Sequence, residues 1–188
     1  MLNANVYEPP ELEEQVLATM YANGAQTHEP SETIVQETRQ WLSKLPPLTT
    51  LIAGYTVPCE VNGQGIVLNG RSVVLPPETL PDGITSRGYV TVYAATIDPN
   101  SLRHTEPNGD PFANGVFGAL NFYILEDMVN SYQHDLEQRS GTKLHRVSPG
   151  YGNFTLNTQR NLMGLLTRKG LPVTLDEESC KLRPLYST

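Results

Sequence analysis

Apolar residues recur at helical spacing near the start of the chain and predict two helices. The first would occupy residues 11–22, where Asn23-Gly24 follows as a stop signal. The second would begin after Ser31, a suitable N-cap, and end before Pro46. Stripes of this kind normally face a core. Their apolar positions are Leu12, Val16, Leu17 and Met20, then Ile34, Val35, Trp41, Leu42 and Leu45.

The pattern then changes to short β-segments. Apolar runs at 59–61 and 66–68 flank a glycine-containing turn, and a third run follows at 72–75. This arrangement predicts a short β-meander. A further strand is expected at 89–96, a run rich in β-branched and aromatic residues.

The C-terminal half predicts a long helix followed by smaller elements. A broad apolar stripe runs through residues 116–139, and Gly141 closes it. A second helix is expected at 156–168, and strands are expected at 173–175 and 180–183.

Helices and short strands in this mixed order are typical of an α+β fold, with a small, mostly antiparallel sheet packed against helices. We expect residues 1–50 to form an N-terminal helical segment and residues 51–188 to form the α+β core. A chain of 188 residues fits one compact domain overall.

Charge and hydropathy argue against two classes of partner. The chain has 13 Lys and Arg against 20 Asp and Glu, a formal charge of −7, and no basic run that could follow a phosphate backbone. Nucleic acid is therefore not an expected partner. No apolar stretch approaches the roughly 20 residues of a membrane span, and no leader-like segment stands at the N-terminus. We expect no membrane partner and a cytoplasmic protein.

Metal and hydrolase signatures are missing from the sequence. Cys59 and Cys180 are far apart, and neither they nor the four histidines show a metal-ligand spacing, so no protein-ligated metal is expected. There is no phosphate-binding loop and no nucleophile elbow. The polar loop before the long helix carries His104, Glu106 and Asp110, but its turn-rich composition favours a solvated connection over an acid–base cluster.

The turn after the long helix has the outline of a ligand-binding loop. Pro149 fixes its own φ, and Gly150 and Gly152 permit backbone geometries or close approaches that a Cβ would forbid. The amides around Tyr151 can therefore face a ligand, while the planar guanidinium of Arg146 suits a carboxylate or phosphate. A tight turn with a surface arginine is the alternative, since Pro-Gly turns are common. The full run is Arg146-Val147-Ser148-Pro149-Gly150-Tyr151-Gly152.

This run, with the residues that follow it, resembles the C-terminal activation domain of cobalamin-dependent methionine synthase. It is more similar still to short standalone relatives of that domain, in which Arg-x-Ser-Pro-Gly-Tyr-Gly leads into a helix with an early glutamine, here Gln159. Upstream, Tyr132-Gln133-His134-Asp135 aligns with a Tyr-x-His-Glu run in the family's long helix. That alignment places Asp127 at an acidic ligand-binding position. The resemblance covers about residues 117–187.

The resemblance implies an S-adenosylmethionine site. Arg146 would anchor the ligand's carboxylate, Asp127 would face its positive charge, and Tyr151 would cover the reacting face. In the family a segment with a further aromatic ligand contact follows the position of Thr188, and the loop at 98–115 is a candidate substitute for it. The implied site residues are Asp127, Arg146, Ser148, Pro149, Gly150, Tyr151 and Gly152.

The implied function is the reductive methylation of a corrinoid-dependent methyltransferase such as methionine synthase. S-adenosylmethionine would be the methyl donor, and a partner protein would present the cobalamin, because this chain has no Asp-x-His-x-x-Gly run. A flavodoxin or ferredoxin is the implied electron donor. Two alternatives remain: a non-enzymatic interaction protein on the same fold, and a methyltransferase or sensor that uses S-adenosylmethionine without a corrinoid.

Overall fold

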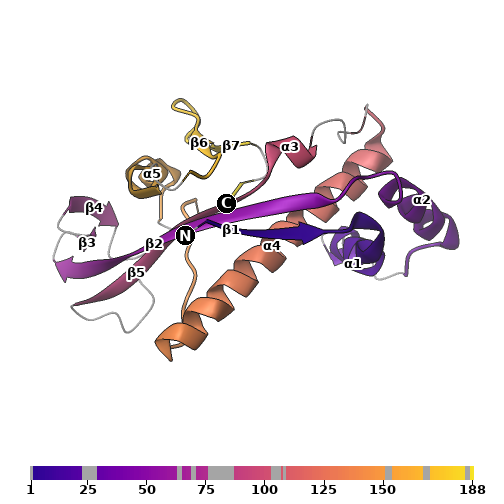
Figure 1. The fold of residues 1–188 in the computed structure, drawn as a ribbon. Coiled ribbons are helices and arrows are strands. Elements are labelled where there is room, and N and C mark those ends of the chain that lie inside the picture. The colour runs from indigo at the N-terminus through magenta and orange to yellow at the C-terminus, as the bar shows by residue number, and fades with distance from the viewer. Residues whose placement is uncertain are drawn as a thin grey trace.

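An antiparallel sheet of five strands runs through the computed structural model, and helices α1 and α2 lie beyond one of its ends (Figure 1). Its helices and strands make a mixed α+β arrangement, which confirms the predicted fold class. The structure describes residues 2–22, 29–62, 65–68, 71–75, 87–102, 107, 109–150, 154–166, 170–184 and 187–188.

Strand β2 organises the sheet. It pairs along one edge with β1 and then with β3, and along the other edge with β5, while β4 pairs with β3. The predicted meander and the strand at 89–96 are therefore present, but β1 and residues 48–58 of β2 were not predicted. The strands are β1 (Leu2–Tyr7), β2 (Leu48–Asn62), β3 (Gly65–Leu68), β4 (Arg71–Leu75) and β5 (Arg87–Ile97).

The four predicted helices are all present. They are α1 (Glu13–Ala22), α2 (Glu32–Leu42), α4 (Pro111–Ser140) and α5 (Gln159–Leu166). Short helical turns occur at η1 (Pro9–Leu12), α3 (Pro99–Leu102) and η3 (Leu156–Thr158), and β6 (Thr174–Leu175) pairs with β7 (Leu182–Arg183) in a separate small sheet.

Helix α4 begins five residues earlier than the apolar stripe predicted, at Pro111 instead of Val116. The carboxylate of Asp110 caps it by accepting hydrogen bonds from the amides of Phe112 (2.9 Å) and Ala113 (3.4 Å). Pro111 occupies the first turn, where its missing N–H costs nothing. At the other end Gly141 takes the left-handed conformation (φ 66°) that closes the helix.

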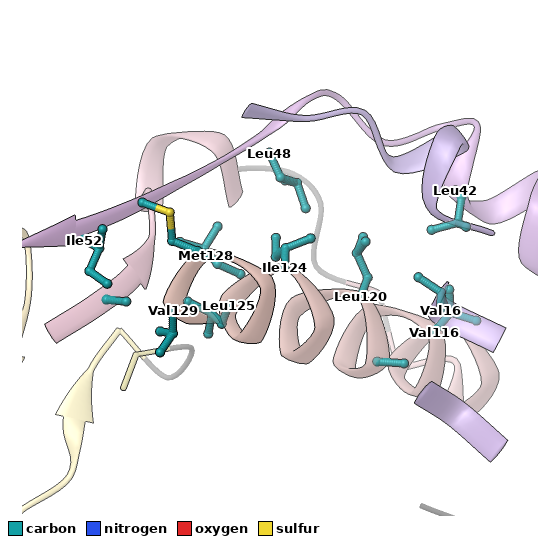
Figure 2. Packing of buried hydrophobic residues seen from close by; sticks show 13 residues of the cluster. Val16, Leu42, Leu48, Ile52, Val116, Leu120, Ile124, Leu125, Met128 and Val129 are labelled. Atoms are coloured by element: carbon teal, nitrogen blue, oxygen red, sulfur yellow. The ribbon is translucent and has the colours of Figure 1, made fainter. Parts of the chain in front are cut away.

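Two hydrophobic clusters lie on opposite faces of the sheet. On one face α4 packs against β2 and β5 while α1 and α2 cover its N-terminal half, and Figure 2 shows Leu120, Ile124 and Met128 directed towards Leu48 and Ile52. The other cluster joins alternate residues of the same strands to α5 and the segment before it. Its buried members are Val57, Cys59, Ile66, Leu68, Val92, Ala94, Phe154 and Leu166. Because strand residues alternate between faces, β2 and β5 contribute to both clusters.

Candidate functional site

The chain leaves α4 at Gly141, and the segment that follows runs back beside the helix and carries Arg146. Helix α4 holds the start of this segment. The carboxylate of Glu137 accepts a 2.8 Å hydrogen bond from the amide of Leu144, and Gln133 donates a 3.1 Å bond to the carbonyl of Leu144. The bond from Leu144 is the main reason that the pKa of Glu137 is lowered. The approach of Arg146 to the helix is therefore fixed by backbone contacts.

The guanidinium of Arg146 is bound to the side of α4. Its Nη2 donates a 2.8 Å hydrogen bond to Oε2 of Glu126, and its Nη1 donates a 3.4 Å bond to Oδ1 of Asn130. The side chain of Arg146 is 30% exposed and that of Glu126 is 37% exposed, so the ion pair is accessible to solvent. Glu126 and Asn130 are four residues apart and share one face of the helix, which lets one arginine contact both.

Tyr93 interacts with Arg146 and also packs against a second tyrosine, Tyr132. The rings of Tyr93 on β5 and Tyr132 on α4 are 5.9 Å apart and tilted at 57°. Burial raises the pKa of Tyr93, and the charge of Arg146 opposes that rise. Partial burial lowers the pKa of Arg146, but Glu126 and Tyr93 raise it, and the net shift is upward. Arg146 therefore remains a cation under all ordinary conditions.

Gly54 on β2 allows Tyr132 to approach the sheet closely. A Cβ built on Gly54 would lie only 2.2 Å from the hydroxyl oxygen of Tyr132. Any larger residue would displace the tyrosine, so the glycine determines how closely Tyr132 can approach the sheet.

The predicted loop itself is turned partly inward. Gly150 has φ 97°, as the sequence suggested, but its amide donates a 2.6 Å hydrogen bond to the carbonyl of the buried Phe154. That amide shapes the loop. Ser148 and Pro149 are half-buried, while Tyr151 and Gly152 lie outside the described residues.

Asp127 points to a different side of α4 from Glu126. It accepts a 2.8 Å hydrogen bond from the hydroxyl of Tyr7 on β1. Successive helix residues are about 100° apart, so Asp127 reaches the first strand while Glu126 reaches Arg146. The structure thus brings Arg146 together with Glu126, not with the acidic residue that the resemblance selected.

The loop before α4 gives no acid–base cluster among the described residues. Asp110 is the helix cap, and His104 and Glu106 lie outside the described part of the chain. Within the residues that the structure describes, no group of three or more His, Cys, Asp and Glu side chains could hold a metal ion.

Glu126, Asn130 and Tyr93 were not selected from the sequence. A partial signal existed for two of them, because Glu126 and Asn130 stand one helical turn apart on a polar stripe of the long helix. Nothing in the sequence indicated that the segment after the helix would return to that stripe. Together these residues place a cation, a carboxylate, an amide oxygen and a phenol around one accessible point, a set suited to a small zwitterionic ligand.

No protein-family model matches the sequence, and no curated protein matches it at a significant level. None of the helices in the described residues is both long and apolar enough to span a membrane.

Proposed function

We propose that this protein binds S-adenosylmethionine at Arg146 and assists the reductive methylation of a corrinoid-dependent methyltransferase such as methionine synthase. The observation that carries the proposal is the accessible ion pair between Arg146 and Glu126, set on a loop whose sequence resembles the activation domain of that enzyme.

The chemistry of this ion pair fits the amino-acid end of S-adenosylmethionine, which carries a carboxylate and an ammonium group. The ligand's carboxylate can replace Glu126 on the guanidinium, and Glu126 can then accept hydrogen bonds from the ammonium. Each charge keeps an opposite partner throughout this exchange. Because both side chains are already about a third exposed, little desolvation opposes it.

The remaining loop residues have supporting roles in this proposal. Ser148, Pro149 and Gly150 maintain the turn that follows Arg146, and the bond from Gly150 to Phe154 anchors that turn to the second hydrophobic cluster. Tyr151 and Gly152 are assigned by resemblance alone, with Tyr151 covering the methyl-bearing sulfonium.

Little acid–base catalysis is required of this chain. A corrinoid presented by the partner would supply the nucleophilic metal that accepts the methyl group, after a flavodoxin or ferredoxin has provided an electron. The residues of this protein would hold the donor in position and balance its charge.

A second candidate is an interaction protein on the same fold that binds no small molecule. The same ion pair favours it, because a guanidinium already bonded to Glu126 and Asn130 does not need a ligand. In that case Arg146 serves to fasten the loop to α4.

Calorimetric titration of S-adenosylmethionine into the protein and into an Arg146→Ala variant distinguishes the two candidates. Arg139→Ala is the matched control, since Arg139 pairs with Asp135 on the exposed last turn of the same helix. Binding that is lost only with Arg146→Ala supports the proposed site and justifies an assay of corrinoid methylation. An absence of heat at millimolar ligand, together with a large loss of thermal stability in Arg146→Ala, supports the interaction protein.

A further inference from the structure

Strand β1 lies at an edge of the sheet, and its outer side has no partner among the described residues. Among the described residues it pairs only with β2, over six positions from Leu2 opposite Ala53 to Tyr7 opposite Leu48. The outer edge of β5, by contrast, has a partner over part of its length. There Ala95 and Thr188 exchange backbone hydrogen bonds of 2.7 and 2.9 Å, which cover part of that strand.

The sequence of β1 lacks the features that normally keep an edge strand from pairing. Leu2-Asn3-Ala4-Asn5-Val6-Tyr7 contains no charge and no proline, and its register with β2 is continuous, without a bulge. Such a strand presents a regular row of backbone donors and acceptors to any extended segment that approaches it.

The side chains of β1 alternate between two different surfaces. Tyr7 and its neighbours at alternate positions face α4, and the hydroxyl of Tyr7 is bonded there to Asp127. Leu2, Ala4 and Val6 point the other way and are exposed, Leu2 by 43% and Val6 by 65%. Exposed apolar side chains thus gather on one face of β1, a strand whose outer edge has no partner among the described residues.

This pattern is complementary to itself when two copies of β1 run antiparallel. If Ala4 lies opposite Ala4 of a second copy, Leu2 of each copy faces Val6 of the other on the exposed face. On the opposite face, Asn3 of each copy faces Asn5 of the other. From position 2 to position 6, apolar therefore meets apolar and amide meets amide, and none of these side chains carries a charge.

We propose that the β1 edge is a self-association surface, at which two copies of this chain pair antiparallel about Ala4 and join their sheets into one. The occupant is a second copy because the strand's own sequence supplies the complementary side chains in a two-fold register. A contact built on one short strand is small compared with the roughly 1,200–2,000 Å² of stable complexes, so the dimer is expected to be weak and concentration-dependent.

Sedimentation velocity from micromolar to millimolar protein is the first test, and a shift towards dimer with concentration is expected. Ala4→Lys places two like charges opposite each other on the dimer axis and should raise the dissociation constant about fivefold or more. The control is Phe122→Lys, an exposed position on α4 and not on β1, which should leave the dimer unchanged. Both positions are exposed, so thermal melting should show that each variant folds.

Cysteine cross-linking tests the register. Ala4→Cys brings the two thiols together across the axis, where mild oxidation should give a covalent dimer. Val6→Cys should not cross-link, because in this register the two copies of position 6 are about 13 Å apart along the strand. The native cysteines, Cys59 and Cys180, are buried and serve as the unreactive background.

Charge exchange gives an independent check on the same register. Leu2→Glu and Val6→Lys should each weaken the dimer alone, and the double variant should restore it, because the new charges face each other across the two copies. Sedimentation as a monomer at every concentration, or equal cross-linking through positions 4 and 6, would overturn the proposal.

Discussion

The hydroxyl of Tyr7 donates a 2.8 Å hydrogen bond to the carboxylate of Asp127 and so joins the first strand of the sheet to the middle of α4. The carboxylate that the resemblance assigned to ligand binding is therefore engaged in holding the fold together. Glu126, the preceding residue, takes the position beside Arg146. The two adjacent acids of α4 thus have separate partners, and this separation can be tested.

Replacing Tyr7 by phenylalanine should lower the free energy of unfolding by about 1 kcal/mol, the usual net contribution of one hydrogen bond. It should also change the alkaline behaviour. Burial, reinforced by Asp127, raises the pKa of Tyr7 from 10.0 to about 12. As the pH rises, the phenol of the unfolded chain loses its proton before that of the folded protein. The contribution of Tyr7 to stability is therefore fully present below pH 10 and is lost as the pH rises towards 12.

Urea denaturation at several pH values between neutrality and pH 12 measures both effects of Tyr7→Phe. The variant should show a shallower alkaline decline, although Tyr93 and Tyr132, whose pKa values burial also raises, will retain part of it. Tyr89→Phe is the control, because Tyr89 is 79% exposed. An unchanged alkaline slope in Tyr7→Phe would show that the Tyr7–Asp127 contact does not govern it.

The two acids should respond differently to ligand titration if Arg146 binds S-adenosylmethionine. Glu126→Gln removes the charge that would receive the ligand's ammonium, and affinity should fall about tenfold or more. Asp127→Asn should leave affinity unchanged and lower thermal stability, because Asp127 contacts Tyr7. Calorimetry of both variants beside the parent protein checks this, and loss of binding in Asp127→Asn alone would return Asp127 to the ligand site.

The turn between β6 and β7 should keep its shape in acid to an unusually low pH. The carboxylate of Asp176 accepts hydrogen bonds from the amides of Ser179 (2.9 Å) and Glu178 (3.2 Å). The bond from Ser179 is the largest cause that lowers the pKa of Asp176 from 3.8 to about 2. Its contribution to stability is therefore present above pH 3.8 and is lost as the pH falls towards 2.

NMR titration of the Asp176 carboxyl, with amide exchange at Ser179, measures this directly. Asp176→Asn should remove the acid-dependent change in exchange while keeping one acceptor oxygen. Arg183→Gln should raise the pKa of Asp176 only in part, because the contact from Arg183 is longer, at 3.4 Å, and ranks below those from Ser179. An Asp176 that titrates near its ordinary value would contradict the observed turn.

Strong helical patterns were easier to read from this sequence than its strands. The stripes of α1, α2, α4 and α5 each bury one face against a core, so spacing alone identified them. Asp110 and Pro111 are a typical start of a helix, and they could have been used to predict where α4 begins. Strand β1 does alternate between apolar and polar residues, but its two asparagines have low β-propensity and conceal the pattern.

Residues 48–58 of β2 were not predicted because they include Gly54 and Pro58, which normally argue against a strand. The strand tolerates both residues because of their surroundings in the folded protein. Pro58 lies between the stretches that pair with β1 and β3, where β2 has a described neighbour, β5, on one side only. Gly54 accommodates Tyr132 from a helix almost 80 positions later, a contact that no local pattern contains.

The candidate site also depends on contacts between residues that are far apart in the sequence. Arg146 and the turn after it carried a recognisable motif, whereas Glu126, Asn130 and Tyr93 joined them only through the path of the chain after Gly141. That path depends on the bonds of Leu144 to Glu137 and Gln133. Contacts between a loop backbone and helix side chains leave no periodic signal in a sequence.

The contact between Gly54 and Tyr132 should appear as a strong coupling in a double-mutant cycle. Gly54→Ala places a methyl group where the tyrosine hydroxyl lies, and it should destabilise the protein by about 1–3 kcal/mol. Tyr132→Phe removes that oxygen and should cost less on its own. In the double variant much of the penalty should disappear, although the next atoms, Tyr132 Cζ at 3.0 Å and Thr91 Cγ2 at 3.3 Å, keep the site tight.

Gly118→Ala is the matched control for Gly54→Ala, since a Cβ at this position of α4 would meet nothing within 4 Å. It should stabilise the protein by up to about 1 kcal/mol, because alanine loses less backbone entropy in a helix. Urea denaturation of the four proteins in the cycle measures the coupling, with Gly118→Ala beside them. If the penalties of Gly54→Ala and Tyr132→Phe simply added, Tyr132 would not occupy the space above Gly54, and the close contact between α4 and β2 at this point would be contradicted.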